Sequence, residues 1–232
     1  QGASATSVSA GAADHAAGAV RLTRSTSIFP PEGLIVWHSY CLRRPAVFAG
    51  LALLLLAIAP APAHGEFLID DFSDGVSALG TRWQAFTDRV MGGRSDISAV
   101  IGRTGRGTAL QMSGTVTTEN NGGFIQVRLP MVAQGSYDAS EYTGVFLTAR
   151  GRGEQFYIWL RTERTNRPWL HYSRQLTVGD DWQRVEVPFA EFEGERRLRN
   201  TRVDADALRS IAVVAAGGDF EAAIQVLEIG FY

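Results

Sequence analysis

The segment Glu154–Arg161 reads EQFYIWLR, and it decides the fold class of this chain. Every second residue in it is strongly apolar, namely Phe156, Ile158 and Leu160. The side chains between them are amphipathic or charged, namely Tyr157, Trp159 and Arg161. Because successive side chains of a strand point to opposite faces, this alternation predicts a β-strand with one buried face.

Similar runs of β-branched and aromatic residues recur from Glu66 to Tyr232, separated by turns rich in Gly, Asp and Asn. They include EFLIDDF, TALQMSGTV, GGFIQVRLP, TGVFLTAR, WLHYSRQL, QRVEVPF, SIAVVAAG and AIQVLEIGFY. The nearest approach to a helical pattern, DADALRSIAVV (204–214), predicts one turn that leads into a strand. The sequence therefore predicts an all-β fold over residues 66–232, a β-sandwich of jelly-roll type built from antiparallel sheets.

The N-terminal part differs in character. Residues 1–40 are rich in Ala, Ser, Gly and Thr without periodicity, which is typical of a disordered extension or a wrongly assigned translation start. Residues 41–65 match the three parts of a secretory signal: the pair Arg43-Arg44, the apolar run 46–59 and the small-residue site Ala61-Pro62-Ala63. We expect a signal-type helix here and export across the inner membrane, to the periplasm or the medium. A retained N-terminal anchor is the alternative, although the apolar run is shorter than the roughly 20 residues of a membrane span.

The composition excludes several partners and chemistries. The formal net charge is −2, so no concentrated positive field recruits nucleic acid. All 22 basic residues are arginine, which excludes a Walker-type phosphate loop and a Schiff base, because both need a lysine amine. With Cys41 as the single cysteine, neither an intrachain disulfide nor a cysteine zinc site can form. No cofactor is expected.

Signatures of catalysis and metal binding are also missing. Of the four histidines only His171 belongs securely to the β-domain, and its place in a strand favours a polar face or a satisfied sheet position over a catalytic triad. The loop DDFSDG has Phe72 where a calcium loop needs an oxygen donor, so a turn is expected. Five acids could supply the pair that a glycosidase needs only if a cleft separated two of them suitably, namely Asp180, Asp181, Glu191, Glu193 and Glu195. The sequence predicts no enzyme and no metal site.

The tryptophans of the domain leave two interpretations open. They could line a sugar-binding groove or fill the core of a sandwich. Trp159 lies on the strand face opposite its apolar neighbours, and Trp169 follows Pro168 in a loop-like segment, so these two are the candidates for exposed aromatics. Trp83 and Trp182 are expected in the core.

The stretch TDRVMGGRSD (87–96) sets an apolar Val-Met pair directly against a Gly-Gly pair. With Trp83 it forms the pattern W-x-x-x-x-D-x-V-M-G-G-x-S, and a second Gly-Gly pair follows in ENNGGFIQVR (119–128). Together with YTGVFLTARGRGEQFYIWLR and DDWQRVEVPFAEF, these motifs resemble the complex I intermediate-associated protein 30 family. The resemblance covers essentially all of residues 67–232.

The resemblance implies a galactose-binding-like jelly roll without known catalysis. Mitochondrial members of that family are assembly factors that bind partly built intermediates of the respiratory NADH:ubiquinone oxidoreductase. It therefore implies a non-enzymatic protein-binding domain with an assembly-factor or chaperone-like role, whose partners include subunits of a membrane complex. The leader is of bacterial type and suggests a bacterial member. The alternative is an exported carbohydrate-binding module.

We expect the two glycine-bearing loops to meet at one end of the sandwich and to form a polar recess for a partner or a sugar. The candidate residues of these loops are Asp88, Met91, Gly92, Gly93, Arg94, Asn120, Asn121, Gly122 and Gly123. The exposed aromatics Trp159 and Trp169 complete the candidate site. In the alternative interpretation the asparagines bond within their own loops and stiffen the fold.

Overall fold

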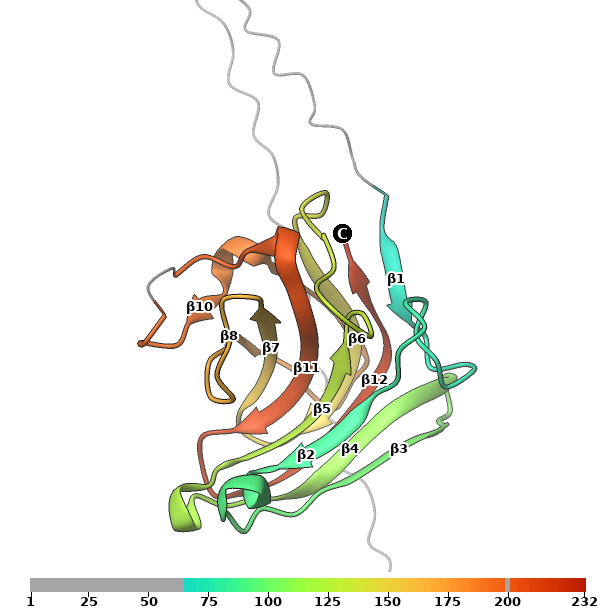
Figure 1. Ribbon diagram of the computed structural model, residues 1–232. Helices are drawn as coiled ribbons and strands as arrows, with labels where there is room; N and C mark the ends of the chain where they lie inside the picture. The colour runs from blue at the N-terminus through green and yellow to red at the C-terminus, as the bar shows by residue number, and fades with distance from the viewer. Residues whose placement is uncertain (1–64, 199–200) are drawn as a thin grey trace, which may run out of the picture. The chain divides into compact units, whose positions relative to one another are not determined.

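A computed structural model describes residues 65–198 and 201–232 (Figure 1). Its strands form two antiparallel six-stranded sheets, here sheet A and sheet B. Sheet A has the order β3 (Ser98–Arg103), β4 (Thr108–Val116), β12 (Phe220–Phe231), β6 (Gly144–Arg152) and β9 (Gln183–Pro188), with β1 (Phe67–Asp70) paired to β12. Sheet B has the order β10 (Glu193–Gly194), β8 (Tyr172–Leu176), β7 (Phe156–Thr162), β11 (Leu208–Ala216), β5 (Phe124–Pro130) and β2 (Gln84–Thr87).

The helical elements of the described residues are single 3₁₀ turns: η1 (Asp88–Met91), η2 (Glu119–Asn121), η3 (Phe189–Glu191) and η4 (Ala205–Ala207). The turn η4 leads directly into β11, as the sequence predicted. The prediction of an all-β, jelly-roll sandwich is thus confirmed. The predicted extension over 1–40 and nearly all of the signal segment 41–65 lie outside the described residues.

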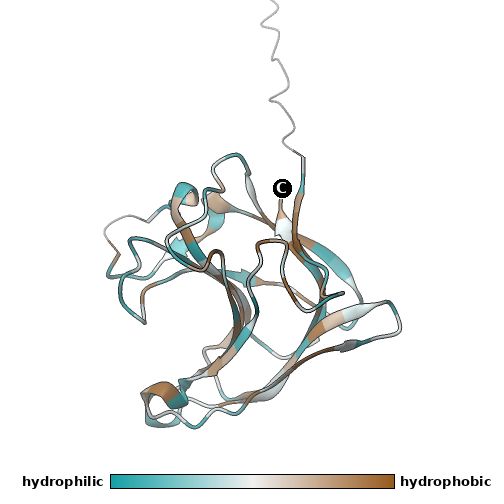
Figure 2. Cartoon of the chain, turned by 45° about the vertical axis from the view of Figure 1, so that its right-hand side comes forward, coloured by the Kyte–Doolittle hydropathy of each residue, from teal (hydrophilic) through white to brown (hydrophobic). Residues whose placement is uncertain are grey.

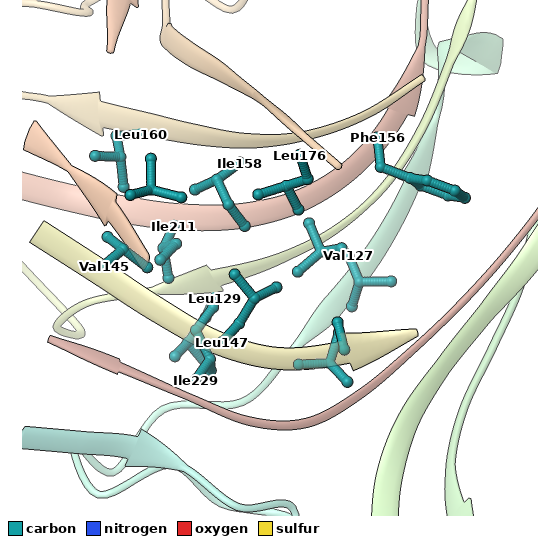
Figure 3. Packing of buried hydrophobic residues seen from close by; sticks show 14 of the residues in the cluster. Val127, Leu129, Val145, Leu147, Phe156, Ile158, Leu160, Leu176, Ile211 and Ile229 are labelled. Carbon is teal, nitrogen blue, oxygen red and sulfur yellow. The ribbon is translucent and has the colours of Figure 1, made fainter. Parts of the chain in front are cut away.

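The core lies between the two sheets and is filled by one face of each central strand (Figure 3). In β7 the burial alternates strictly: Phe156, Ile158 and Leu160 are buried, and the residues between them are partly exposed. The first and last strands of the domain lie side by side, because Phe67 of β1 pairs with Phe231 of β12. As predicted, Trp83 packs against this core, and it donates to Asp70 Oδ2 at 2.9 Å. The prediction that Trp182 lies in the core is wrong: it lies outside the core cluster, with the Arg150 guanidinium 4.7 Å from its ring centre.

The strands are bowed, and the hollow side of sheet B is the side turned away from sheet A (Figure 1). Hydrophilic and hydrophobic residues alternate along these strands as teal and brown segments (Figure 2). One set of residues faces the core and the other faces outward, as period-two side-chain geometry requires. The outer face of sheet B is therefore a concave surface whose side chains are free for another role.

Candidate functional site

The outer face of sheet B has a central row of small side chains. They come from β11 and are Ser210, Ala212, Val214 and Ala216. The flanking strands β5 and β7 carry larger residues at the paired positions, since Ala212 lies between Arg128 and Trp159. All four small residues are buried, and the groove on this face is lined by larger side chains of both flanking strands, among them Gln126, Arg128 and Trp159.

Aromatic rings from both flanking strands line this groove. The Trp159 ring lies 5.7 Å from the Phe124 ring across β11, and together they cover a second, small apolar cluster on the outer face. The His171 imidazole stacks on Trp159, with 3.9 Å between ring centres and 20° between planes. One face of the Trp159 indole is thus occupied within the protein.

The groove has a volume of about 670 Å³. At one end lies η1, whose Val90 and Met91 are 73% and 55% exposed. Trp169 lies on the groove as well and is 45% exposed. Exposed large apolar side chains that gather in one place on a protein surface mark an interaction site, so the groove is a candidate binding site.

An adjoining hollow of about 470 Å³ extends the groove at its other end and shares Arg128, Arg161 and Pro168 with it. Arg209 lines it too. Burial, followed by the positive charges of Arg128 and Arg209, lowers the pKa of Arg161 to about 10. Burial also lowers the pKa of Arg128. This end of the groove is therefore a partly desolvated, positively charged surface.

The outer face of sheet A has a smaller hollow of about 310 Å³, but its polar groups are engaged with one another. Gln225 accepts from Arg150 Nε at 2.8 Å and donates to Gln111 at 3.0 Å, and Arg152 is paired with Asp180. A surface whose donors and acceptors are already satisfied gains less from a ligand. Sheet B is the better candidate.

The two glycine-bearing loops meet at the η1 end of the groove around one carboxylate. Asp88 is fully buried, at 0% exposure, and accepts from Ser95 Oγ at 2.5 Å, from Ser95 N at 3.0 Å and from Gly123 N at 2.6 Å. Phe124 N adds a longer bond of 3.4 Å. Desolvation raises the pKa of Asp88, but these hydrogen bonds outweigh it, so the pKa lies below the ordinary value. Asp88 thus binds Gly123, which lies 35 positions further along the chain, and so joins the two loops. Its carboxylate does not line the groove.

The two glycines of each pair are required for different reasons. Gly92 and Gly123 have φ of 92° and 122°, a region that favours glycine. A Cβ on Gly93 or on Gly122 would overlap the Asp88 carboxylate. The Gly-Gly pairs of the two motifs therefore provide one backbone turn and one close approach apiece, and both serve the buried Asp88.

The remaining polar candidates lie on the rim of these loops. Arg94 pairs with Glu119 at 2.9 Å, with both side chains well exposed. Asn120 Nδ2 donates to the Gly92 carbonyl at 3.3 Å, which joins one glycine loop to the other. Asn120 and Asn121 both have positive φ, 57° and 59°. Such contacts suit a loop-stiffening role for Asn120, while Asn121 remains on the groove wall.

Several predicted site residues are brought together by the groove, namely Met91, Asn121, Gly122, Gly123, Trp159 and Trp169. The others do not line it: Asp88, Gly92, Gly93, Arg94 and Asn120. Sequence reasoning missed Phe86, Gln126, Arg128, Arg161 and His171, which do. A signal was present, because Gln126 and Arg128 share the strand parity of Phe124, and Arg161 shares that of Trp159.

The stacked His171 is expected to make the stability of the domain depend on pH in the acid range. Burial, then the charge of Arg161, lowers its pKa from 6.5 to about 4, with Glu195 opposing. Since the unfolded chain then binds the proton at higher pH than the folded one, stability is full above pH 6.5 and falls toward pH 4. The variant His171→Phe keeps a ring on Trp159 but has no titrating group there. On acidification over this range, we expect its free energy of unfolding to fall by about 2 kcal/mol less than that of wild type. Urea unfolding at pH 7.5 and 4.5 measures the difference, and equal losses would contradict the assignment.

Among the described residues no cluster of three or more His, Cys, Asp or Glu side chains is placed to hold a metal ion. In the same ranges no helix has the length and hydropathy needed to cross a membrane.

Comparison with known proteins adds to this description. A family model described as Complex I intermediate-associated protein 30 matches residues 71–227. The mouse protein "Complex I intermediate-associated protein 30, mitochondrial" (Mus musculus) is 29% identical over 139 residues, which are 52% of this chain and 42% of that protein. The match thus spans less than half of that relative's length.

Solved structures share the fold. The family 11 carbohydrate-binding module of a cellulosomal cellulase of Clostridium thermocellum has a TM-score of 0.59 and 19% identity, covering 73% of this chain and 95% of that one. A family 30 carbohydrate-binding module has a TM-score of 0.52 and 16% identity, covering 73% and 88%. At these identities the likeness concerns the β-sandwich itself.

Proposed function

The chain belongs to the Complex I intermediate-associated protein 30 family, and from that premise we propose a non-catalytic protein-binding role. The domain holds an extended segment of a protein partner in the groove of sheet B and acts as an assembly factor or chaperone-like protein. The name of the mouse relative supports such a role, and subunits of a membrane complex are the partners we propose.

One observation carries the proposal. Six large apolar side chains are exposed in the described ranges, and three of them, Val90, Met91 and Trp169, lie on the same groove. Scattered exposed apolar residues need no explanation, but a gathered set marks an interaction site. Methionine suits such a site, because its unbranched side chain adapts to irregular partner surfaces.

The shape of the groove favours a protein segment over a sugar. Sugar stacking needs a flat, open aromatic face, and His171 already occupies one face of Trp159. At the η1 end the exposed groups are aliphatic. Such pockets suit the side chains of a peptide.

The lining of the groove also supports a role without catalysis. Among the described lining residues there is no Asp or Glu, and His171 is neutral at pH 7 because its pKa is lowered to about 4. General acid-base chemistry needs a group that exchanges protons near the working pH. A binding role does not require such a group.

Carbohydrate binding is the second candidate, and Trp169 favours it. This indole is 45% exposed, lies on the groove, and has the Arg167 guanidinium 5.6 Å from its ring centre. The two modules with the same fold are described as carbohydrate-binding.

Export remains part of the proposal and rests on the leader sequence alone. If the signal at 41–65 is used, the domain acts beyond the inner membrane. Cell fractionation combined with N-terminal sequencing of the mature protein tests this, and a mature protein that retains residues 1–40 would contradict it.

We expect the double substitution Val90→Ser/Met91→Ser to abolish capture of a specific set of proteins by photo-crosslinking of the tagged full chain in its own cells. The control is Val100→Ser/Ile101→Ser, an adjacent apolar pair that is 56% and 40% exposed on β3 of sheet A. A set that wild type and the control recover and the groove variant loses supports the proposal. Recovery of no protein, or of one unchanged set from all three, refutes it, and a glycan array then tests the second candidate.

A further inference from the structure

Three arginines from three adjacent strands meet at one end of the groove. Arg128 lies on β5 and Arg161 on β7, on either side of β11. Arg209 precedes Ser210 at the point where the register of β11 against β7 shifts. Arg209 and Ser210 both line the adjoining hollow, together with Arg128 and Arg161. The chain as a whole is slightly acidic, so this concentration of positive charge is local.

These three arginines lack a carboxylate partner in the part of the chain that the structure describes. Other arginines there do form ion pairs, among them Arg89, Arg94, Arg152, Arg164, Arg174 and Arg184. The Arg128 guanidinium lies 4.3 Å from the Phe86 ring centre, and Arg161 donates to the Pro168 carbonyl. Among the described residues, no Asp or Glu lines either hollow.

Holding like charges together at a partly buried place is unfavourable unless an anion neutralises them. Arg161 reflects this cost, since burial and its two arginine neighbours depress its pKa. A guanidinium offers a planar fork of donors that fits a carboxylate in bidentate fashion. The missing partner is therefore an anionic group of the ligand.

We propose that the occupant of the groove is an extended acidic protein segment, which places an apolar side chain against Val90 and Met91 and carboxylates against Arg128, Arg161 and Arg209. This inference rests on the proposed protein-binding function and specifies the chemistry of the partner. Phe124 lies at the η1 end, where its amide is 3.4 Å from Asp88 Oδ2, and Arg128 follows four positions later on β5, about 13 Å away at roughly 3.3 Å per residue. An extended peptide covers that length with about four residues, so the apolar anchor and the first acid are about four positions apart.

An acidic polysaccharide would also satisfy the arginines. The peptide is favoured because the charged end is continuous with the aliphatic surface of η1: one groove includes both Met91 and Arg128. A polyuronide chain repeats the same polar unit and has nothing to place against Val90 and Met91.

The test uses the folded full chain and an array of short peptides. Each peptide carries Leu or Trp followed about four positions later by two acidic residues, and a matched array has Asn and Gln in place of the acids. We expect the acidic peptides to bind at least about tenfold more tightly, with a preference that declines as salt rises. The variant Arg128→Gln/Arg209→Gln should lose this preference. The control Arg103→Gln/Arg106→Gln removes the same charge from exposed positions on the β3–β4 hairpin of sheet A and should keep it.

The outcomes separate this inference from the function on which it rests. Peptides that bind equally well with and without acids, or an acid preference that survives in Arg128→Gln/Arg209→Gln, overturn the acidic-segment inference and leave the protein-binding role standing. If no peptide binds but polygalacturonate does, with the same dependence on the arginines, both the acidic-segment inference and the protein-binding role are overturned. Circular dichroism and thermal melting check that each variant is folded.

Discussion

Replacing Asp88 by alanine is expected to lower the free energy of unfolding by about 3 kcal/mol, because it strips the partner from several buried donors at once. The amides of Ser95 and Gly123 and the Ser95 hydroxyl all donate to this carboxylate. Asp88 and Ser95 are both 0% exposed, so the two Ser95 donors would be left without this partner in a buried place. Urea unfolding of the purified protein at pH 7 measures the loss.

The control for this experiment is Asp96→Ala in the same loop. Asp96 is well exposed and makes one ion pair, with Arg89 at 3.2 Å, so its loss should change stability by no more than about 0.5 kcal/mol. If Asp88→Ala proves as harmless as Asp96→Ala, the two glycine-bearing loops are not held by Asp88. Both variants carry the same change in charge, so the comparison isolates the buried hydrogen bonds.

The pH dependence of Asp88 offers an independent check. Its folded pKa is lowered below the ordinary 3.8, so its contribution is present above that value and is lost as the pH falls through the folded pKa. Wild type should therefore lose more stability than Asp88→Asn on acidification below about pH 4, because the amide does not titrate.

Strand identity was predictable from the sequence, whereas strand order was not. The alternation in EQFYIWLR fixes one buried and one outer face for β7, and the structure confirms both. Pairing depends on long-range packing: β5 and β7 flank β11, although Phe124 and Leu208 are more than 80 residues apart in the sequence. Local periodicity carries no information about which strands become neighbours.

The same limit explains what sequence reasoning found and missed in the site. Trp159 and Trp169 could be identified from strand parity and loop context, each by itself. The cluster of Arg128, Arg161 and Arg209 exists only because three strands lie side by side and the register of β11 shifts. The burial of Asp88 could not be predicted from the sequence either, because its donor Gly123 is 35 residues away.

The two glycines of the first motif should respond differently to alanine, because each is required for a different reason. Gly92 has a φ of 92°, but nothing lies within 4 Å of an added Cβ, so Gly92→Ala meets only the left-handed backbone cost of about 1–2 kcal/mol. At Gly93 the added Cβ would overlap the Asp88 carboxylate and would lie 2.8 Å from Asp88 Cβ. Because this neighbour is buried and hydrogen-bonded, we expect Gly93→Ala to cost about 3 kcal/mol.

Gly105→Ala is the matched control for the pair, since its Cβ would meet nothing within 4 Å and its φ is not positive. It should change the free energy of unfolding by less than about 0.5 kcal/mol. A double-mutant cycle then identifies the neighbour: in an Asp88→Ala background the cost of Gly93→Ala should fall, because the carboxyl group it overlaps is gone. An unchanged cost in that background, or a Gly93→Ala loss no larger than that of Gly92→Ala, would show that the close approach to Asp88 is not what requires glycine at position 93.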